Sequence, residues 1–504
     1  MMSEFTSRVS AAIVANRERF LRMVDAALNA RDDERACAEI ESAARFAALC
    51  GTGVYASSAL ERRLRGIAVA ISCGSGDGRE VSGTLLVATE LYAVGGHTKV
   101  LERFGQMLAA SCERVSLFIS SPTNVFVPES LRESVRKSGG EIMAPDDSSR
   151  CERARRLRTC ALAFRRVVLM THPEDVVPVL AFGTDAFPRP VFAYGHTNHT
   201  FWLGVSVVDR LLEINDWGRD IATRLRGIAR DRISVVGLPV ERLKTGPSTT
   251  DRAVLLEKFG IPAEGPLVVT AASPRKFRTV GCLDFAEILE GVLSDPKSPT
   301  FAIVGPDDAS TPEWDCLRRK HLGRIVCTGP VGYSDLLACY AAADVVVDSY
   351  PLNGWTSLVD AISVGAAVVC PQGAMGLMDY LVDSPAYACD AASAVVKVSA
   401  LLSDPSLRLE NSSEMRRRMA QSTDYESVKD RLVVALNQTT SHLVHEFSER
   451  INEEPTIQDM AIYAMTMRRK KKFAIPGFEL FSVREGATKC HELSLLGGRF
   501  IWRF

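Results

Sequence analysis

Residues 348–371 decide the fold; they read Asp-Ser-Tyr-Pro-Leu-Asn-Gly-Trp-Thr-Ser-Leu-Val-Asp-Ala-Ile-Ser-Val-Gly-Ala-Ala-Val-Val-Cys-Pro. A short apolar run at 345–347 comes directly before them and predicts a buried strand. A polar loop at 349–355 follows, and apolar residues at helical spacing from about Thr356 predict a helix. A strand, a loop and a helix in this order are typical of a parallel α/β sheet.

The same alternation of apolar runs and helical stretches extends on both sides of this segment. Runs that do not alternate between apolar and polar residues suit parallel strands covered on both faces. We therefore expect an α/β protein with two doubly wound sheets. The predicted strands of the first sheet are 67–71, 85–88, 115–119, 167–170 and 191–193, and those of the second are 233–236, 267–270, 301–304, 325–327, 345–347 and 367–369.

Four segments are expected along the chain. They are a helical extension at 1–65, a first α/β domain at 66–243, a second at 244–440 and a tail at 441–504 that packs back on the first domain. Residues 244–250, Lys-Thr-Gly-Pro-Ser-Thr-Thr, are the best linker. Helices are predicted at 394–402, 406–422 and 425–449, with a helix near the end crossing back onto the first domain, and 473–504 is less regular.

Composition and charge favour an ordinary globular protein. The chain has 504 residues, of which 46% are hydrophobic and 24% charged, and its formal net charge is -1. This near-neutral balance favours neither nucleic acid nor an anionic membrane as a partner. The sequence suggests no secretory signal and no run of about 18 apolar residues that would span a membrane. The 13 scattered cysteines predict reduced thiols, and we expect a cytoplasmic protein.

The predicted helix near Thr356 begins where a strand of an open sheet has just ended, which is where ligands gather. A helix N-terminus offers unpaired N–H groups and about half a positive charge, so it suits a phosphate or diphosphate. Gly354 allows close approach, Thr356 and Ser357 add hydroxyl groups, and Asp360 could accept hydrogen bonds from ribose. The alternative is that Thr356 or Ser357 only caps the helix.

These residues resemble a known loop. Asn353-Gly354-x-Thr356-Ser357, followed by Asp360-Ala361, Gly365 and Val368-Val369, resembles the nucleotide-sugar loop of GT-B glycosyltransferases, most closely those of glycosyltransferase family 41. That family contains O-GlcNAc transferases and bacterial N-glycosyltransferases that modify adhesins. The resemblance implies two Rossmann-like domains facing a cleft and a nucleoside diphosphate sugar, UDP-linked, as donor. It implies that the donor diphosphate meets Asn353, Gly354, Trp355, Thr356 and Ser357 and that Asp360 meets the ribose.

Two further loops gain a role from the resemblance. Arg275 and Lys276 follow the predicted strand 267–270, where GT-B enzymes often bring a cation to the diphosphate; Lys276 is the first candidate and Arg275 the second. The alternative is that Arg275 and Lys276 are exposed loop residues with no role in binding. The nucleobase region would be formed by backbone groups of Gly305, Pro306, Thr328, Gly329 and Val331.

The candidate site residues of the first domain include three histidines, which follow two of its predicted strands. Gly95 and Gly96 precede His97 after the predicted strand 85–88. The resemblance to GT-B enzymes implies that a Gly-Gly loop at this place faces the donor phosphate or the acceptor, and His97 could contact the transferred sugar or act as a base. His196 and His199 follow the predicted strand 191–193. An imidazole titrates near neutrality and could take the acceptor's proton, with His196 as first choice, while structural hydrogen bonding is the alternative. No third ligand with suitable spacing accompanies the two histidines, so no metal is expected.

The expected function is that of an inverting, metal-independent glycosyltransferase without a cofactor. The acceptor remains open between a protein and a glycan, and no nucleic-acid partner or transmembrane segment is expected. One alternative is a retaining GT-B transferase or a sugar-nucleotide 2-epimerase. Another alternative is a non-catalytic binding protein of the same fold. Trp355 supports this alternative because family 41 commonly has His or Asn at that position.

Overall fold

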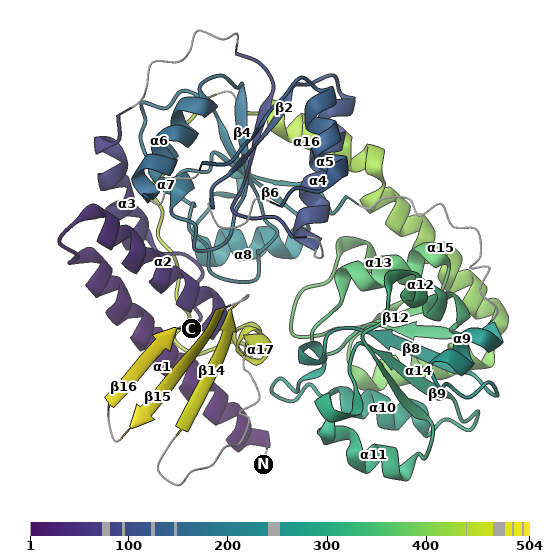
Figure 1. The fold of residues 1–504 in the computed structure, drawn as a ribbon. Coiled ribbons are helices and arrows are strands. Elements are labelled where there is room, and N and C mark those ends of the chain that lie inside the picture. Colours follow the sequence, from purple (N-terminus) through teal and green to yellow (C-terminus); the bar gives the residue numbers. More distant parts are fainter. Residues whose placement is uncertain are drawn as a thin grey trace. The chain divides into compact units, whose positions relative to one another are not determined.

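The computed structural model describes residues 2–72, 81–92, 96–121, 126–145, 149–239, 252–439, 441–466, 479–485, 488–495 and 498–503. Contacts between residues divide the chain into a large unit, Met1–Met465, and a small one, Thr466–Phe504. Figure 1 shows the elements of both units. We describe each unit by itself.

Three helices open the large unit: α1 (Met2–Leu28), α2 (Asp33–Cys50) and α3 (Ser58–Ala70). Side chains cap two of them, since Asp32 accepts a hydrogen bond from the N–H of Arg35 and Ser57 from that of Leu60. The predicted helical character of this region is confirmed. The strand predicted at 67–71 is wrong, because residues 67–70 end α3; Ile67 is buried there while Val69 is 74% exposed.

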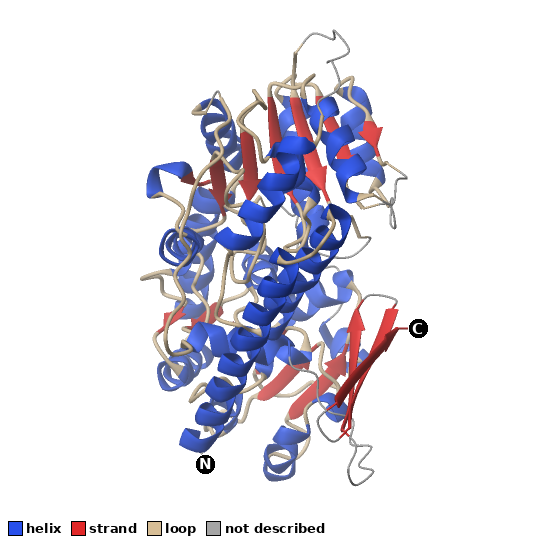
Figure 2. Ribbon diagram, turned by 90° about the vertical axis from the view of Figure 1, so that its left-hand side faces the viewer, coloured by secondary structure: helices blue, strands red, loops and turns tan. Residues whose placement is uncertain are grey.

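Seven parallel strands form the first sheet, in the order β3-β2-β1-β4-β5-β6-β7. Leu86 and Ala88 of β1 face the apolar cluster that includes α4 and α5, whereas Leu85 and Val87 face the cluster with α6 and α7. Helices therefore cover both faces, as Figures 1 and 2 show. The strands are β1 (Thr84–Ala88), β2 (Val115–Ile119), β3 (Ile142–Met143), β4 (Arg166–Met170), β5 (Val191–Tyr194), β6 (Arg210–Glu213) and β7 (Ile233–Val235), and the helices are α4 (Gly96–Ala110), α5 (Glu129–Lys137), α6 (Arg150–Ala161), α7 (Val177–Phe182) and α8 (Asp216–Arg226).

The predicted strands 85–88, 115–119, 167–170 and 191–193 are all found in this sheet. The run 233–236, assigned to the second sheet from its sequence, instead forms β7 and pairs with β6 at the end of the first sheet. An apolar run does not reveal which neighbour it will pair with, since pairing depends on contacts distant in sequence. Strands β3 and β6 were not predicted.

Six parallel strands form the second sheet, in the order β10-β9-β8-β11-β12-β13. All five runs predicted at 267–270, 301–304, 325–327, 345–347 and 367–369 are confirmed, and only the two-residue β13 was missed. The strands are β8 (Leu267–Ala271), β9 (Thr300–Val304), β10 (Ile325–Gly329), β11 (Val345–Val347), β12 (Val368–Pro371) and β13 (Tyr387–Ala388), with helices α9 (Arg252–Lys258), α10 (Phe285–Leu293), α11 (Asp315–Lys320), α12 (Tyr333–Ala342) and α13 (Trp355–Val364).

Four helices follow the second sheet: α14 (Ala391–Ser403), α15 (Pro405–Thr423), α16 (Tyr425–Asn437) and α17 (Ile457–Thr466). α16 crosses back to the first domain, as predicted, because Arg431 donates to the carbonyl of Val236 at 3.1 Å and Arg166 donates to that of Leu436 at 3.1 Å. The helix predicted to reach residue 449 ends at Asn437. The extended chain after it is held by side chains; His442, for example, contacts Asp209 at 2.8 Å.

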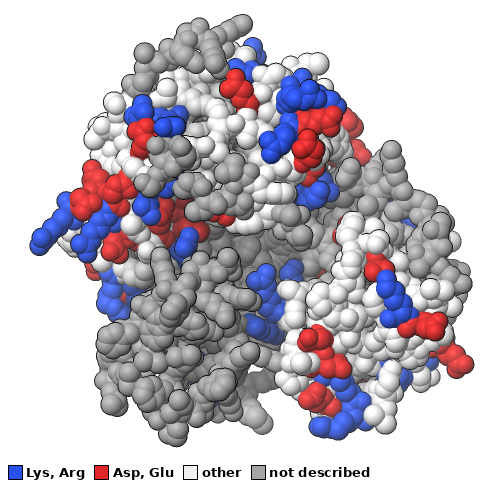
Figure 3. Space-filling model, viewed as in Figure 1, with Lys and Arg blue, Asp and Glu red and all other residues white. Residues whose placement is uncertain are grey.

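The small unit contains three antiparallel strands, β14 (Glu479–Glu485), β15 (Thr488–Leu495) and β16 (Gly498–Arg503). The expectation of a less regular tail was therefore wrong for these residues. Within the part of the chain that the structure describes, no helix is both long and apolar enough to cross a membrane. Figure 3 shows Lys and Arg interspersed with Asp and Glu on the visible face, in keeping with the near-zero net charge.

Candidate functional site

The loop between β11 and α13, residues 348–354, is built around the buried carboxylate of Asp348. One carboxylate oxygen accepts from the N–H groups of Ser349 at 2.8 Å and Gly354 at 2.9 Å. The other accepts from the side-chain amide of Asn353 at 3.1 Å. Burial raises the pKa of Asp348, and the charge of Lys276 and these donors oppose the rise. We call residues 348–354 the Asp348 loop; sequence reasoning missed its central residue because a strand-end Asp is common.

Two side chains predicted to face a diphosphate point into the protein instead. The amide nitrogen of Asn353 also donates to the carbonyl of Pro371 at 3.1 Å, and the residue is only 5% exposed. The hydroxyl of Ser357 donates to the carbonyl of Ala271 at 3.0 Å and contacts the hydroxyl of Tyr340. Both side chains therefore hold the loop and the first turn of α13 in place. Sequence spacing could not show this, because their partners lie on β8, β12 and α12.

The N-terminus of α13 has no side-chain cap. Its N-cap residue is Gly354, which has no side chain with which to cap the helix. Ser357 and Leu358 both donate to the carbonyl of Gly354, at 2.6 and 3.1 Å. Helix geometry leaves the preceding N–H groups, those of Trp355 and Thr356, without intrahelical acceptors. Thr356 is exposed, so its hydroxyl and these N–H groups are the donors that the predicted helix start offers.

Lys276 lies beside this helix start. It belongs to a 3₁₀ turn, Pro274–Phe277, that follows β8, and its ammonium group donates to the backbone carbonyl of Asn353 at 2.7 Å. An ammonium has three N–H donors, so this bond leaves two for other acceptors. Burial lowers the pKa of Lys276, while Asp348 raises it and Arg275 lowers it further. The structure thus brings Lys276 to the Asp348 loop, and Arg275, next in the chain, is exposed.

Trp355, the residue that departs from the family pattern, is engaged in a tertiary contact. Its indole N–H donates to the carbonyl of Gly376 at 3.1 Å, and its ring meets that of Trp217 edge to face with centroids 5.8 Å apart. A side chain at position 376 would collide with Trp217, since an added Cβ would lie 2.0 Å from its ring. The tryptophan therefore packs α13 against the loop after β12 and against α8.

Asp360 lies one turn further along α13 and is partly buried. The hydroxyl of Tyr333 donates to its carboxylate at 3.0 Å. Burial raises the pKa of Asp360 to about 6, although the bond from Tyr333 and the charge of Arg103 act in the opposite direction. The carboxylate is thus charged at neutral pH and keeps acceptor capacity for a ligand hydroxyl.

The loops predicted to hold a nucleobase lie against each other. The N–H of Gly305 donates to the carbonyl of Gly329 at 2.9 Å, and that of Gly329 donates to the carbonyl of Pro306 at 2.8 Å. Gly305 has a φ of 111° and leaves no room for a side chain, because an added Cβ would lie 2.2 Å from the carbonyl oxygen of Ala272. The loops after β8, β9 and β10 are therefore neighbours. The Thr328 hydroxyl donates to the carbonyl of Gly329 at 2.9 Å.

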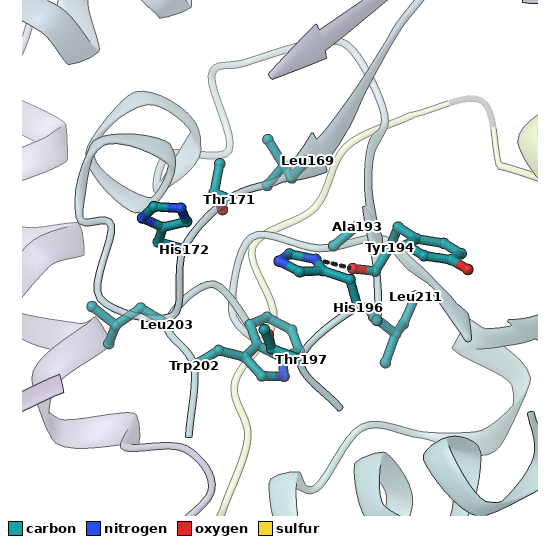
Figure 4. Close-up of a pocket in the computed structure, with 11 residues that line it drawn as sticks. Leu169, Thr171, His172, Ala193, Tyr194, His196, Thr197, Trp202, Leu203 and Leu211 are labelled. Atoms are coloured by element: carbon teal, nitrogen blue, oxygen red, sulfur yellow. Dashed lines mark hydrogen bonds between the residues drawn. The ribbon is translucent and has the colours of Figure 1, made fainter. Parts of the chain in front are cut away.

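In the first sheet, three histidines gather at the carboxyl ends of β4 and β5. The ring centroids of His97 and His196 are 4.5 Å apart, and those of His97 and His172 are 6.1 Å apart. We call these three residues the histidine cluster. Figure 4 shows His172 and His196 lining a small cavity together with Trp202, and its volume of about 20 Å³ is room for about one water molecule. His172, which sequence reasoning missed, follows the predicted strand 167–170, and that position was the available signal.

Backbone carbonyls orient two of these rings. Nε2 of His97 lies 2.9 Å from the carbonyl oxygen of Met170, and Nδ1 of His196 lies 3.2 Å from that of Tyr194. Each contacting nitrogen carries the proton, so the opposite nitrogen keeps a lone pair. Burial lowers the pKa of His97, with a smaller contribution from His172, and burial followed by the charge of His97 lowers the pKa of His196 further. Both rings are neutral near pH 7 and can accept a proton.

His199 lies outside the cluster. Burial lowers its pKa to about 4, followed by the positive charges of Arg226, Lys276 and Arg275. Arg226 is fully buried, and it donates to the carbonyls of Asn198 and Thr200 at 2.7 and 2.6 Å. Arg226 therefore holds the loop that carries both His196 and His199 in place through its backbone carbonyls.

Some predicted site residues are not tested by the described structure. Gly95 lies outside the described residues, and Gly96 is placed only as the first residue of α4. Val331 is partly buried and packs against the apolar cluster that includes Leu267 and Val346 of the second sheet. Among the described residues, no group of three or more His, Cys, Asp or Glu side chains is arranged to hold a metal ion.

Comparison with known proteins resolves the fold but no family. No protein-family model matches the chain, and no curated protein sequence does. The structure is similar to a glycosyltransferase from Rickettsia africae ESF-5, with a TM-score of 0.53 and 12% identity over 71% of this chain and 98% of that one. It is also similar to Anabaena HepE in complex with UDP, with a TM-score of 0.53 and 13% identity over 71% of this chain and 100% of that one.

A third similar structure is an O-GlcNAc transferase mutant from Thermobaculum terrenum, with a TM-score of 0.50 and 13% identity over 84% of this chain and 82% of that one. Identities this low establish the fold alone. The two parallel sheets, of seven and six strands, agree with the two Rossmann-like domains that were predicted. The chain therefore has the GT-B glycosyltransferase fold.

Proposed function

We propose that the chain is a glycosyltransferase that moves a sugar from a UDP-linked donor to a protein or glycan acceptor. One observation carries the proposal: the α13 N-terminus has a glycine at its N-cap and Lys276 beside it. A helix start and an ammonium group at one strand end suit a diphosphate. Asp360 would accept from the ribose, and the Gly305 and Gly329 loops would border the nucleobase.

In this proposal, catalysis rests on the stabilisation of the leaving diphosphate. Negative charge develops on the leaving group as the glycosidic bond breaks, and Lys276, Thr356 and the α13 N–H groups would compensate it. Arg275 is a second cation in the same turn. Such a site supplies positive charge through its own side chain and backbone, so the proposed reaction needs no metal.

His196 is the proposed base that removes the acceptor's proton. Its ring is neutral, its Nδ1 donates to the Tyr194 carbonyl, and its Nε2 keeps a lone pair. His97 is the second choice because it shares the same cluster, and His199 is the third. Direct displacement by an acceptor activated in this way would invert the anomeric centre. Analysis of the product anomer distinguishes it from a retaining reaction.

We further propose kinship with glycosyltransferase family 41. It rests on residues 353–360 and on the similarity to an O-GlcNAc transferase over 84% of this chain. The inward orientation of Asn353 limits its proposed role to positioning Lys276 and Gly354.

The proposal is tested by calorimetry with UDP, GDP, ADP and dTDP, followed by mass spectrometry of acceptor mixtures with UDP-glucose and UDP-N-acetylglucosamine. We expect UDP to bind tightest and one of the two sugars to be transferred. Binding of none of the four nucleotides would contradict the donor site. Tight UDP binding without turnover of any UDP-sugar would instead favour a non-catalytic binding protein.

A further inference from the structure

Two cysteines from separate elements meet where the N-terminal helices pack on the first domain. Cys37 lies on α2 and is fully buried, and Cys151 lies in the first turn of α6 and is partly buried. The Cys37 thiol donates a hydrogen bond to the Cys151 sulfur. Both sulfurs are free thiols in this structure. Neither residue belongs to the proposed donor or acceptor machinery.

Contacts on both sides of Cys37 fix this arrangement independently. Glu34, one helical turn before Cys37, accepts from the Ser149 hydroxyl at 2.5 Å and from the Cys151 N–H at 3.0 Å. Glu41, one turn after Cys37, pairs with Arg150 at 2.6 Å. Residues three and four apart lie on one face of a helix. Cys37 therefore sits between two anchored carboxylates, directly opposite the start of α6.

The surroundings make the two thiols unequal. The hydrogen bond from Cys37 lowers the pKa of Cys151, and the same bond, followed by burial, raises the pKa of Cys37. A thiolate is the reactive form of cysteine. Cys151 is also the more accessible of the two, whereas a fully buried Cys37 cannot meet a dissolved oxidant first. Cys151 is thus suited to attack an oxidant, and Cys37 is suited to resolve the oxidised product.

We propose that Cys37 and Cys151 form a reversible oxidation site that takes a hydroperoxide as its oxidant and ends as a disulfide between α2 and α6. In the first step the Cys151 thiolate attacks one oxygen of hydrogen peroxide. An S–O bond forms, the O–O bond breaks and hydroxide leaves, so the sulfur is oxidised by two electrons to a sulfenic acid while the peroxide is reduced.

In the second step the Cys37 sulfur attacks the Cys151 sulfur. The S–S bond forms, the S–O bond breaks, and the departing hydroxide takes the Cys37 proton to become water. A dithiol reductant reverses the reaction by thiol–disulfide exchange. The product joins the N-terminal helices covalently to the first domain, and α2 also contacts that domain elsewhere, for example through the Ala48 carbonyl, which accepts from the Thr200 hydroxyl at 2.8 Å.

The test treats the reduced full-length protein with hydrogen peroxide at low molar excess and counts its thiols after denaturation. We expect the loss of two of the 13 thiols, a tryptic peptide pair that joins Cys37 to Cys151, and recovery of both thiols with dithiothreitol. The melting temperature of the oxidised protein should rise above that of the reduced protein.

Three variants make the result specific. Cys151→Ser should abolish the cross-link. Cys37→Ser should leave a dimedone-reactive sulfenic acid on residue 151. Cys112→Ser removes an exposed cysteine and should behave as wild type. If Cys37→Ser does not fold, Cys151→Ser and the wild-type peptide map decide alone. A cross-link between other cysteines, or a Cys151 that oxidises while Cys37 stays free in the wild type, would overturn the proposal.

Discussion

The ends of the two sheets differ in the chemistry they present. The Asp348 loop surrounds a buried carboxylate whose oxygens accept from two backbone N–H groups and one side-chain amide. Lys276 and the uncapped N-terminus of α13 lie next to this loop. In the histidine cluster, burial holds the pKa of His97 and that of His196 below the usual range, so these two rings carry no fixed charge. One strand end thus supplies positive charge and the other supplies neutral proton acceptors.

In the proposed reaction, the two sheet ends would take separate roles, one binding the donor diphosphate and the other accepting the proton. In both sheets the carboxyl ends of parallel strands gather loops at the place where strand order reverses. What the loops present depends on burial. A lysine beside a carboxylate keeps its charge even when partly buried, whereas an imidazole with only neutral carbonyl partners loses its proton. The predictions below test this division, beginning with the largest effect.

The first prediction removes the proposed base. His196→Ala should lower turnover by roughly 10²- to 10⁴-fold, the usual contribution of a general base, while UDP affinity stays unchanged. Wild-type activity should fall only when the pH drops well below 6.5, because the lowered pKa keeps His196 neutral above that point. Initial rates with saturating donor, measured between pH 5 and 8, provide the check.

His199→Ala is the matched control from the same loop. His199 lies outside the histidine cluster, so we expect a much smaller loss of turnover. Full turnover in His196→Ala would remove that residue as the base and leave His97 as the candidate.

The second prediction removes the centre of the Asp348 loop. Asp348→Ala should lower the free energy of unfolding by about 3 kcal/mol, because two N–H groups and the Asn353 amide lose their acceptor inside the protein. UDP binding should be lost with it. Urea unfolding gives the stability. The control is Asp335→Ala, in which a carboxylate paired with Lys258 at the surface is removed; its effect should stay below about 1 kcal/mol.

The third prediction separates charge from structure at the same loop. Lys276→Met keeps the length of the side chain but removes the ammonium group, and should weaken UDP binding roughly 10- to 100-fold. The melting temperature should fall only slightly, since Lys276 donates to the Asn353 carbonyl and the Asp348 carboxylate keeps its donors from Ser349, Asn353 and Gly354. Lys258→Met, at an exposed ion pair on α9, should bind UDP as wild type does. Equal UDP affinity in Lys276→Met and wild type would disprove the proposed diphosphate contact.

The fourth prediction concerns Asp360 and has the smallest effect. Its pKa of about 6 means that the carboxylate is ionised above pH 6 and accepts stronger hydrogen bonds from ribose there. The ratio of wild-type to Asp360→Asn affinity for UDP should therefore fall as the pH drops through 6, and using the ratio cancels the titration of UDP itself. Tyr333→Phe removes a donor that favours the ionised form, and should shift this midpoint upward by roughly half a pH unit.

The raised pKa of Asp360 also predicts how the free energy of unfolding depends on pH. The folded-state pKa of about 6 lies above the ordinary value of 3.8, so the folded chain binds the proton more tightly than the unfolded chain does. The contribution of Asp360 to the free energy of unfolding should therefore decline as the pH rises from about 4 to 6. Asp360→Asn should remove this decline.

The UDP-binding test has its own contradicting outcome. If the pH midpoint of the affinity ratio is the same with and without Tyr333→Phe, the assigned hydrogen bond from Tyr333 to Asp360 is wrong.

Sequence reasoning predicted the sheets better than their edges. Unbroken apolar runs identified ten of the strands and placed nine of them in the correct sheet, because parallel strands are buried on both faces and need apolar residues throughout. The same signal failed at 67–71, where an apolar run ends α3, and at 233–236, which joined the other sheet. Short strands such as β3 and β13 were missed since two residues give no pattern. The tail was misjudged because its three strands pair only with each other, in antiparallel registers that no unbroken apolar run announces.

The candidate site divides in the same way. Residue order placed Lys276, Thr356 and Asp360 at strand ends and a helix start, and those positions are where they lie. It could not show that Asn353 and Ser357 turn inward, because their acceptors come from other strands. It also missed Asp348 and His172, whose importance arises only from what surrounds them.

By itself, the sequence determined the class of fold and the candidate anion-binding start of α13, since both follow from local order: an apolar run, a glycine-containing loop and an amphipathic helix. Tertiary structure alone decided which side chains face a ligand, which imidazoles lose their charge and which cysteines meet. The physical reason is that hydrogen-bond partners and burial set those properties, and both come from segments far apart in the chain.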